Sequence, residues 1–131
     1  MGIESEIWSV TSFNELYKEG IEKDRKRNLG ITNHKSYVEE CFSENLPTVA
    51  VSEYQRSFPN QIRQWINGKY IVLGTDGFGR SDSREALRDF FEIDHHHIIL
   101  ASLRALDKEK DFKEYVSKNK IKIKEISPWE T

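Results

Sequence analysis

Two short apolar runs constrain the fold of this chain more than any other feature of its sequence. Thr48–Val51 follows Pro47, and Tyr70–Leu73 lies between Gly68 and a glycine-rich stretch that begins at Gly74. Runs of this length with such boundaries are typical of strands covered on both faces of a parallel sheet. Helical patterns alternate with these strands. The sequence therefore predicts an α/β protein, a three-layer α/β/α sandwich around a mostly parallel, mixed sheet.

Apolar spacing and capping residues predict six helices. The first, at 13–29, begins after Ser12, which forms a capping-box pattern with Glu15, and Gly20 and Gly30 are expected to punctuate it. Three of the others are expected at 36–43, at 54–66 with Pro59 in the first turn, and at 83–91 with Asp82 and Glu85 as a capping pair. The last two are expected at 94–106 and 108–118. In the helix at 94–106 Asp94 is the expected cap, and the side chains expected to face inward are Ile98, Leu103 and Leu106.

Two further strands are predicted near the ends of the sequence. The β-prone run at 7–10 precedes the first helix, and the run at 121–126 alternates isoleucine with charged residues, as an edge strand with lysines facing water would. We expect residues 1–131 to form a single domain, in which 107–131 is a C-terminal helix and an extended tail.

Composition excludes several classes of function. The 131 residues are 37% hydrophobic and 32% charged with a formal net charge of -2, so we expect a globular chain without a nucleic-acid or membrane partner. The longest apolar stretch, at 98–105, is far shorter than the ~20 residues of a membrane span. Cys41 is the single cysteine, and residues 1–6 do not resemble a signal peptide, so a cytoplasmic location is expected.

The turn at 74–83 is the most distinctive candidate site, because ligands often bind between a strand and the following helix. Its glycine spacing nearly matches a phosphate-binding loop, but arginine replaces the expected lysine and an aspartate lies inside the loop. The alternative is a tight turn whose charged side chains form ion pairs or a subunit contact. Both interpretations concern the same candidate interface or anion-contacting residues: Asp76, Arg80, Asp82 and Arg84.

Other polar clusters predict no chemistry. His95, His96 and His97 are adjacent, and neighbouring helical side chains point about 100° apart, so they are expected to start a partly exposed helix with one ring packed inward. The basic run at 25–27 is balanced by Glu22 and Asp24, which favours a solvated face. We therefore predict no catalytic, cofactor-binding or metal-binding residue.

The residues of the turn and the helix after it carry a resemblance to a known family. The stretch Leu-Gly-Thr-Asp-Gly-Phe-Gly-Arg-Ser-Asp-Ser-Arg at 73–84, Leu-Arg at 87–88 and Phe-Glu-Ile-Asp at 91–94 closely resemble the homodimeric pyruvate dehydrogenase decarboxylating component. The similarity extends from Ile3 to about Leu106. Transketolase is similar here too, but it normally has glycine at the position of Asp82.

The resemblance implies the transketolase-like third domain of a three-domain enzyme that oxidatively decarboxylates pyruvate for acetyl-CoA synthesis. In that family the first two domains bind thiamine diphosphate and magnesium, and the third contributes to dimer packing. The implied partners are those upstream domains, the second subunit and the acetyltransferase core of the complex. The family domain opens with a strand and a helix before the position of Ile3, so both are expected to be missing and the chain alone is expected to be inactive. An independent anion- or nucleotide-binding module using the turn at 74–83 is the alternative.

Overall fold

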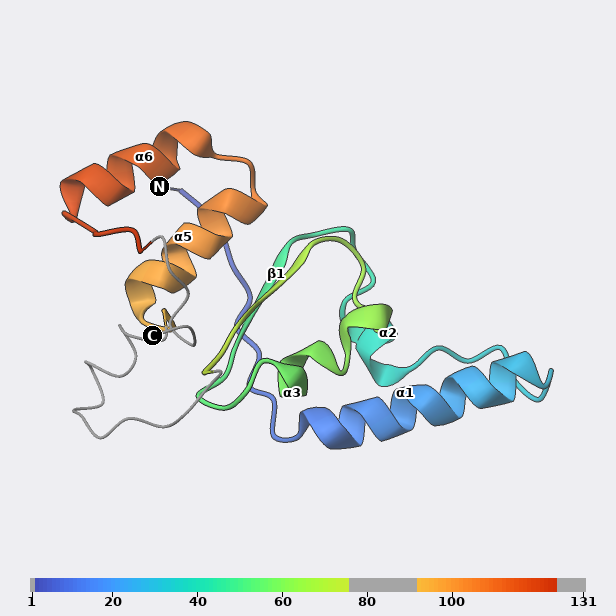
Figure 1. Cartoon of the computed structure of the whole chain (residues 1–131). Helices are drawn as coiled ribbons and strands as arrows, with labels where there is room; N and C mark the ends of the chain where they lie inside the picture. Colours follow the sequence, from blue (N-terminus) through green and yellow to red (C-terminus); the bar gives the residue numbers. More distant parts are fainter. Residues whose placement is uncertain (1, 76–91, 125–131) are drawn as a thin grey trace.

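The computed structural model describes residues 2–75 and 92–124, and Figure 1 shows how their elements are arranged. In this part of the chain, two strands alternate with helices in the order that the sequence predicts. The elements are α1 (Phe13–Asn28), α2 (Tyr37–Cys41), β1 (Thr48–Val51), α3 (Ser57–Asn60), a 3-10 helix η1 (Arg63–Trp65), β2 (Tyr70–Leu73), α5 (His95–Ala105) and α6 (Glu109–Lys118).

The two apolar runs form the sheet, as predicted. β1 and β2 pair in parallel, with Thr48 opposite Tyr70 and Val51 opposite Leu73. In Figure 1 the helices α1, α2 and α3 lie on one side of this sheet, and α5 and α6 lie on the other. The described residues thus form an α/β arrangement with helices on both faces. β1 is half-buried rather than fully buried, and Val51 at its end is exposed.

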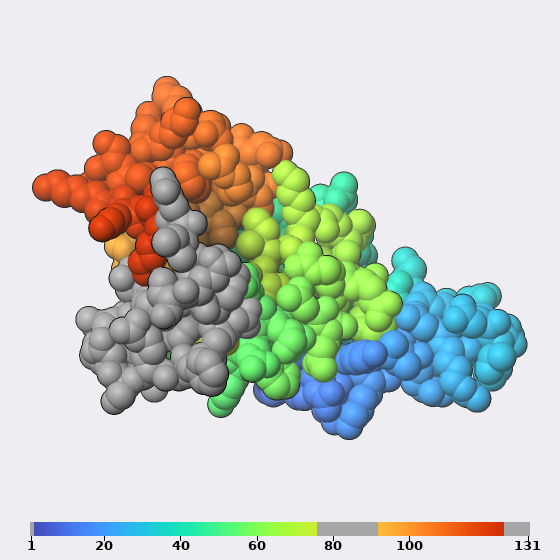
Figure 2. All heavy atoms as spheres, in the orientation of Figure 1, coloured from blue at the N-terminus to red at the C-terminus, as the bar shows by residue number. Residues whose placement is uncertain are grey.

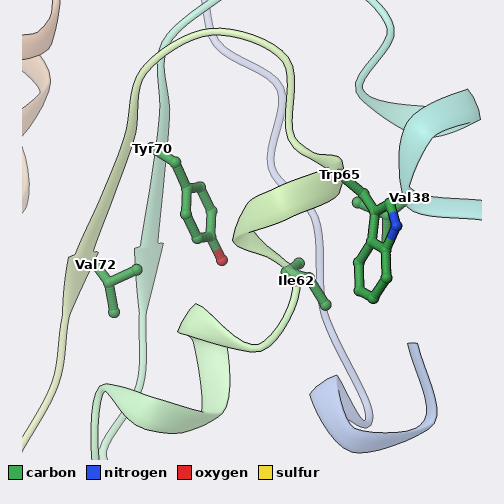
Figure 3. Close-up of a cluster of buried hydrophobic side chains, with 5 residues drawn as sticks. All are labelled: Val38, Ile62, Trp65, Tyr70 and Val72. Atoms are coloured by element: carbon green, nitrogen blue, oxygen red, sulfur yellow. The ribbon is translucent and has the colours of Figure 1, made fainter. Parts of the chain in front are cut away.

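The first face of the sheet carries an apolar core, shown in Figure 3. Tyr70 and Val72 of β2 pack with Ile62, Trp65 and Val38 of α2, and each of these side chains is less than a tenth exposed. Alternate residues of a strand lie on the same face, which explains why positions 70 and 72 enter this core together. Burial of five large side chains provides the main stabilisation of this face.

The second face is covered by α5. Its buried side chains are Leu100, Leu103 and Ala105, and Leu103 is fully buried. The predicted inward face included Leu106, which is wrong, because Leu106 follows the helix and remains 37% exposed. The predicted cap is confirmed, since the Asp94 side chain accepts a hydrogen bond from the His97 backbone N–H at 3.0 Å.

Helix α1 agrees with its predicted bounds but not with the predicted role of Gly20. Ser12 caps the helix by accepting from the Glu15 N–H at 3.1 Å. Gly30, with φ of +71°, follows the helix end as a left-handed C-terminal cap. Gly20 interrupts nothing. It lies buried inside α1, where an added Cβ would come 2.6 Å from the Trp65 ring, so this position needs glycine for a close approach.

The single helix predicted at 54–66 is wrong. The chain forms instead the short α3 and then η1. The Pro59 carbonyl accepts a hydrogen bond from the Tyr70 hydroxyl at 2.8 Å, and the Ile62 N–H also approaches this carbonyl, at 3.5 Å. A continuous α-helix would use that carbonyl for the Arg63 N–H. Here the chain makes the tighter Ile62–Pro59 bond instead, and the predicted core residues Ile62 and Trp65 still become buried.

The strands predicted at both ends are absent from the described residues. Residues 7–10 form no regular structure, and Trp8 instead packs on the Phe42 ring, 5.2 Å between centroids. Residues 121–124 likewise form no strand. Both segments have strand-like composition, but a strand requires a hydrogen-bonded neighbouring strand, and within residues 2–75 and 92–124 the strands that pair are β1 and β2. The helices predicted at 36–43 and 108–118 are confirmed as α2 and α6, whereas that at 83–91 lies outside the described residues.

Candidate functional site

The candidate turn begins where the two strands end together. The Thr75 hydroxyl donates to the Glu53 carbonyl at 2.6 Å, and the Thr75 N–H donates to the Tyr54 carbonyl at 2.8 Å. A Cβ on Gly74 would come 2.7 Å from Cγ of Arg56 and 2.8 Å from the Tyr54 carbonyl oxygen. Gly74 therefore permits close packing of the two segments that follow β1 and β2. The tight turn expected from the glycines at 74–83 stays a prediction, because its residues from 76 onward lie outside the described residues.

The four residues singled out in this turn, Asp76, Arg80, Asp82 and Arg84, lie outside the described residues. Their assignment to an interface or to an anion-contacting loop stays a prediction. The described residues show how the turn starts, at the carboxyl ends of two parallel strands. In open α/β sheets this edge is a common location for binding sites.

A network of charged side chains joins α1, α2 and η1. The Arg27 guanidinium donates to both carboxylate oxygens of Glu39, at 2.8 and 3.3 Å, and also bonds Asp24. The second oxygen of Asp24 accepts from the Trp65 indole N–H at 3.0 Å. The expectation of a fully solvated basic run is wrong for Arg27, whose side chain is only 27% exposed. Ion pairs three residues apart on a helix, such as Asp24 and Arg27, are the sequence signal that was available.

The same network holds Glu39 in its ionised form. Hydrogen bonding from Arg27 keeps the pKa of Glu39 below its ordinary value of 4.5, and hydrogen bonds from Ser36 act in the same direction. Glu39 and Ser36 also form a reciprocal capping box at the start of α2. One carboxylate therefore both caps α2 and binds it to α1, which is a structural task.

Tyr70 is a buried tyrosine at the start of β2. Burial raises the pKa of Tyr70 to about 12, although the positive charge of the nearby Arg63 acts in the opposite direction. Its hydroxyl bonds the Pro59 carbonyl and its ring packs in the core of Figure 3. The phenol therefore stays protonated at neutral pH and serves as a hydrogen-bond donor.

The three histidines have separate contacts, as expected from their spacing. His95 is exposed, and its ring lies 4.0 Å from that of His96. His96 hydrogen-bonds the Tyr115 hydroxyl of α6 at 2.9 Å, and His97 packs inward against Asp94 at 2.5 Å. Within residues 2–75 and 92–124, no three side chains of the metal-binding types gather as a metal site would require.

A pocket at the end of α5 and the start of α6 is lined by Arg104, Asp107, Lys108, Glu109 and Phe112, and three of these charged side chains form ion pairs. The Arg104 guanidinium pairs with Glu109 at 2.5 Å and stacks over the Phe112 ring, 4.3 Å from its centroid. Asp107 on the pocket rim pairs with Lys69 at 3.0 Å. These pairs link the loop before α6 to α5 and to the start of β2.

Large apolar side chains are exposed in the segment before α1. Ile7 is 95% exposed and Trp8 47% exposed, and the side chains of Ile3 and Val10 are exposed as well. Figure 1 shows this segment passing from the side of α5 and α6 to the start of α1. Sequence reasoning placed residues 7–10 in a strand and so missed this surface. A protein surface that carries several exposed apolar side chains together is typical of a contact with another chain or domain.

Comparison with known proteins identifies the class of this domain. The model of the transketolase-like TK C-terminal domain family matches residues 1–94. The chain belongs to that family, which agrees with the parallel β1–β2 pair and the helices around it. None of the helices in the described part combines the length and apolarity that crossing a bilayer requires.

The individual proteins most similar in sequence, among those compared, include several pyruvate dehydrogenase E1 components. The chain is 50% identical over 109 residues to the pyruvate dehydrogenase E1 component of Pseudomonas aeruginosa, which covers 80% of this chain and 12% of that protein. The E1 component of Cupriavidus necator is 45% identical over 111 residues, covering 82% and 12%, and that of Buchnera aphidicola subsp. Baizongia pistaciae is 43% identical over 134 residues, covering 96% and 15%. The chain thus spans only 12 to 15% of the length of these relatives.

Proposed function

We propose that this chain is the architectural and dimerisation domain of a thiamine-diphosphate-dependent pyruvate dehydrogenase, and that it has no catalytic role of its own. The observation that carries the proposal is the 50% identity to an E1 component within a transketolase-like C-terminal domain. In this proposal the rest of the enzyme binds thiamine diphosphate and magnesium and decarboxylates pyruvate. The acetyltransferase core of the complex and a second subunit are its partners, in the cytoplasm.

The contacts of the described titratable groups support an architectural role. Glu39 and Arg27 bind α2 to α1, the Tyr70 hydroxyl bonds the Pro59 carbonyl of α3, and Asp94 caps α5. Each of these four groups also has a shifted pKa, and each helps to hold an element in place. The exposed apolar side chains before α1 supply surface for a contact with further domains.

A domain replacement tests the proposal. In the Pseudomonas aeruginosa E1 component, the residues that align with this chain are either deleted or replaced by this chain. Dimer formation is measured by analytical ultracentrifugation, and pyruvate decarboxylation with thiamine diphosphate and magnesium is measured alongside. We expect the deletion to lose dimer and activity, the replacement to regain both, and this chain alone to show no activity.

Two results contradict the proposal in different ways. Decarboxylation by this chain alone would show that it has a catalytic role. A deletion variant that keeps its dimer and its full activity would show that the domain has no architectural role.

A further inference from the structure

The last residue of α6 and the segment after it concentrate positive charge on the surface. Residues 118–123 read Lys-Asn-Lys-Ile-Lys-Ile, with three lysines and no carboxylate, although the whole chain has a net charge of -2. We call residues 118–123 the lysine segment. Figure 2 shows this part of the chain, in red, at the surface beside α6. Lys118, Lys120 and Lys122 are all exposed.

The ammonium groups of this segment have no partner among the residues that the structure describes. Many other cations of the chain are neutralised, as in the pairs Lys18–Glu15, Arg25–Glu22 and Lys113–Glu109. No ion pair or hydrogen bond reaches the side chains of Lys118, Lys120 or Lys122 within residues 2–75 and 92–124. The positive charge of the segment is therefore available to a binding partner.

The backbone of the lysine segment is held at one end and free at the other. The N–H groups of Lys120 and Ile121 bond the carbonyls of Ser117 and Val116, which fixes the exit from α6. Beyond this turn, Lys122 and Ile123 make no hydrogen bond within the described residues. Ile123 is 54% exposed, so an extended partner would find both free backbone groups and an apolar side chain.

Lys120 occupies a backbone position that favours glycine. Its φ of +53° is left-handed, as is the φ of +71° at Gly30, which ends α1 in the same way. A side chain with a Cβ is strained in this region, and lysine lacks the short polar side chain by which asparagine or aspartate tolerates it. A charged side chain at a strained position suggests that the charge has a use, because glycine would make the more stable turn.

We propose that the lysine segment is a docking site for a short acidic segment of another protein chain. Lys120 and Lys122 alternate with Ile121 and Ile123, which suits pairing with an extended peptide whose carboxylates face the lysines. The net negative charge of the rest of the chain disfavours long polyanions such as DNA or an anionic bilayer. A short peptide stays within about one Debye length, roughly 8 Å, of the lysines. This proposal does not depend on the pyruvate dehydrogenase assignment.

The test uses the full chain and a fluorescein-labelled oligoglutamate peptide, with binding followed by fluorescence anisotropy at several salt concentrations. We expect saturable binding that weakens with salt. The triple variant Lys118→Glu, Lys120→Glu, Lys122→Glu should bind about tenfold more weakly or worse. A matched variant with the same change of charge on α1 and the following loop, Lys18→Glu, Lys23→Glu, Lys35→Glu, should lose no more than about threefold.

A single substitution separates binding from folding. Lys120→Gly should raise the melting temperature, because glycine relieves the left-handed strain, and should still weaken peptide binding. A more stable variant that binds less well cannot be explained by unfolding.

Three results would overturn the proposal. The first is no saturable binding of the peptide by the unaltered chain, and the second is an equal loss in the two triple variants. The third is that the chain binds single-stranded DNA or phosphatidylserine vesicles more tightly than the peptide, and that the lysine-segment variant loses this binding. That result would assign the lysine segment to those polyanions instead.

Discussion

Trp65 combines apolar and polar contacts in the core that covers the first face of the sheet. Its ring lies against Gly20 of α1 and 6.0 Å from the Tyr17 ring, and its indole N–H bonds Asp24. It also packs with Val38 and Ile62 in the core. One side chain from η1 thus fixes the position of α1 through an apolar contact and a polar one.

We predict that Gly20→Ala destabilises the protein, although alanine is the better helix former. The added Cβ would come 2.6 Å from the Trp65 ring, so the free energy of unfolding should fall by about 1–3 kcal/mol. In a Trp65→Leu background, which removes the distal ring, the same change should be neutral or stabilise by up to about 1 kcal/mol. Urea unfolding of the four variants measures both effects. Equal effects in the two backgrounds would disprove the contact.

A second residue-scale prediction concerns pH. Because Arg27 keeps the pKa of Glu39 below 4.5 in the folded chain, ionised Glu39 stabilises the fold. This contribution is complete above pH 4.5 and is lost as pH falls through the folded pKa. At neutral pH Glu39→Gln should lower the free energy of unfolding by roughly 1 kcal/mol, and the difference from wild type should shrink below pH 4.5.

The matched control for this pH prediction is Glu40→Gln, at the exposed neighbouring position, which should change stability little at any pH. Denaturant unfolding between pH 3 and pH 7 gives the comparison. A difference between Glu39→Gln and wild type that stays constant over this range would show that ionisation of Glu39 does not contribute.

At the scale of elements, α5 covers the second face of the sheet with a few side chains. Leu103 is fully buried, whereas Leu106, only three residues later, has left the helix and is 37% exposed. Helical spacing alone would place both on one inward face. The helix end at Ala105 decides the difference, because the Asp107 N–H bonds the Arg104 carbonyl in a turn with φ of +57° at Asp107.

We predict that Leu103→Ala costs about 2–5 kcal/mol of unfolding free energy, because it leaves a cavity between α5 and the sheet. Leu106→Ala should cost less than about 1 kcal/mol, since its side chain is partly in water. The two variants remove the same atoms and differ in burial. Thermal or urea unfolding measures both, and similar losses would show that α5 does not pack as described.

At the scale of the whole molecule, the described residues leave apolar surface exposed at separated places. Ile7 lies before α1, whereas Leu29 and Ile31 follow its far end, which projects from the body in Figure 2. Exposure of such side chains offers no stability to the chain alone. In the architectural role proposed above, the N-terminal segment contributes to the contact with the remaining domains.

Ile7→Ser tests that role. The side chain is 95% exposed, so the stability of the isolated chain should change by less than about 0.5 kcal/mol. In the hybrid Pseudomonas aeruginosa enzyme, the same change should weaken dimer assembly or lower its melting temperature. The control is Leu29→Ser, because the Leu29 side chain is also largely exposed, at 61%. It should change neither the dimer assembly nor the melting temperature of the hybrid enzyme. If the hybrid enzyme with Ile7→Ser kept its dimer assembly and its melting temperature, the segment before α1 would not be part of the proposed contact.

Local sequence determined β1, β2 and the starts of α1 and α5. The short run Thr48–Val51 after Pro47 predicts β1, and Ser12 and Asp94 predict the first turns of α1 and α5, because a capping side chain satisfies backbone groups within three residues of itself. The turn at 74–83, with Asp76, Arg80, Asp82 and Arg84, was found by its glycines and by family resemblance. Its function stays a prediction.

Only the tertiary structure decided which residues from distant parts of the chain contact one another. The helix expected at 54–66 is divided into α3 and η1, and at this division the Pro59 carbonyl accepts a hydrogen bond from Tyr70, eleven residues further along the chain. Gly20 was expected to punctuate the first helix and instead allows the close approach of Trp65, 45 residues further along the chain. Short-range periodicity specifies which side chains can be buried. The partner that buries them, and the strand that a β-prone segment needs, come from other parts of the fold.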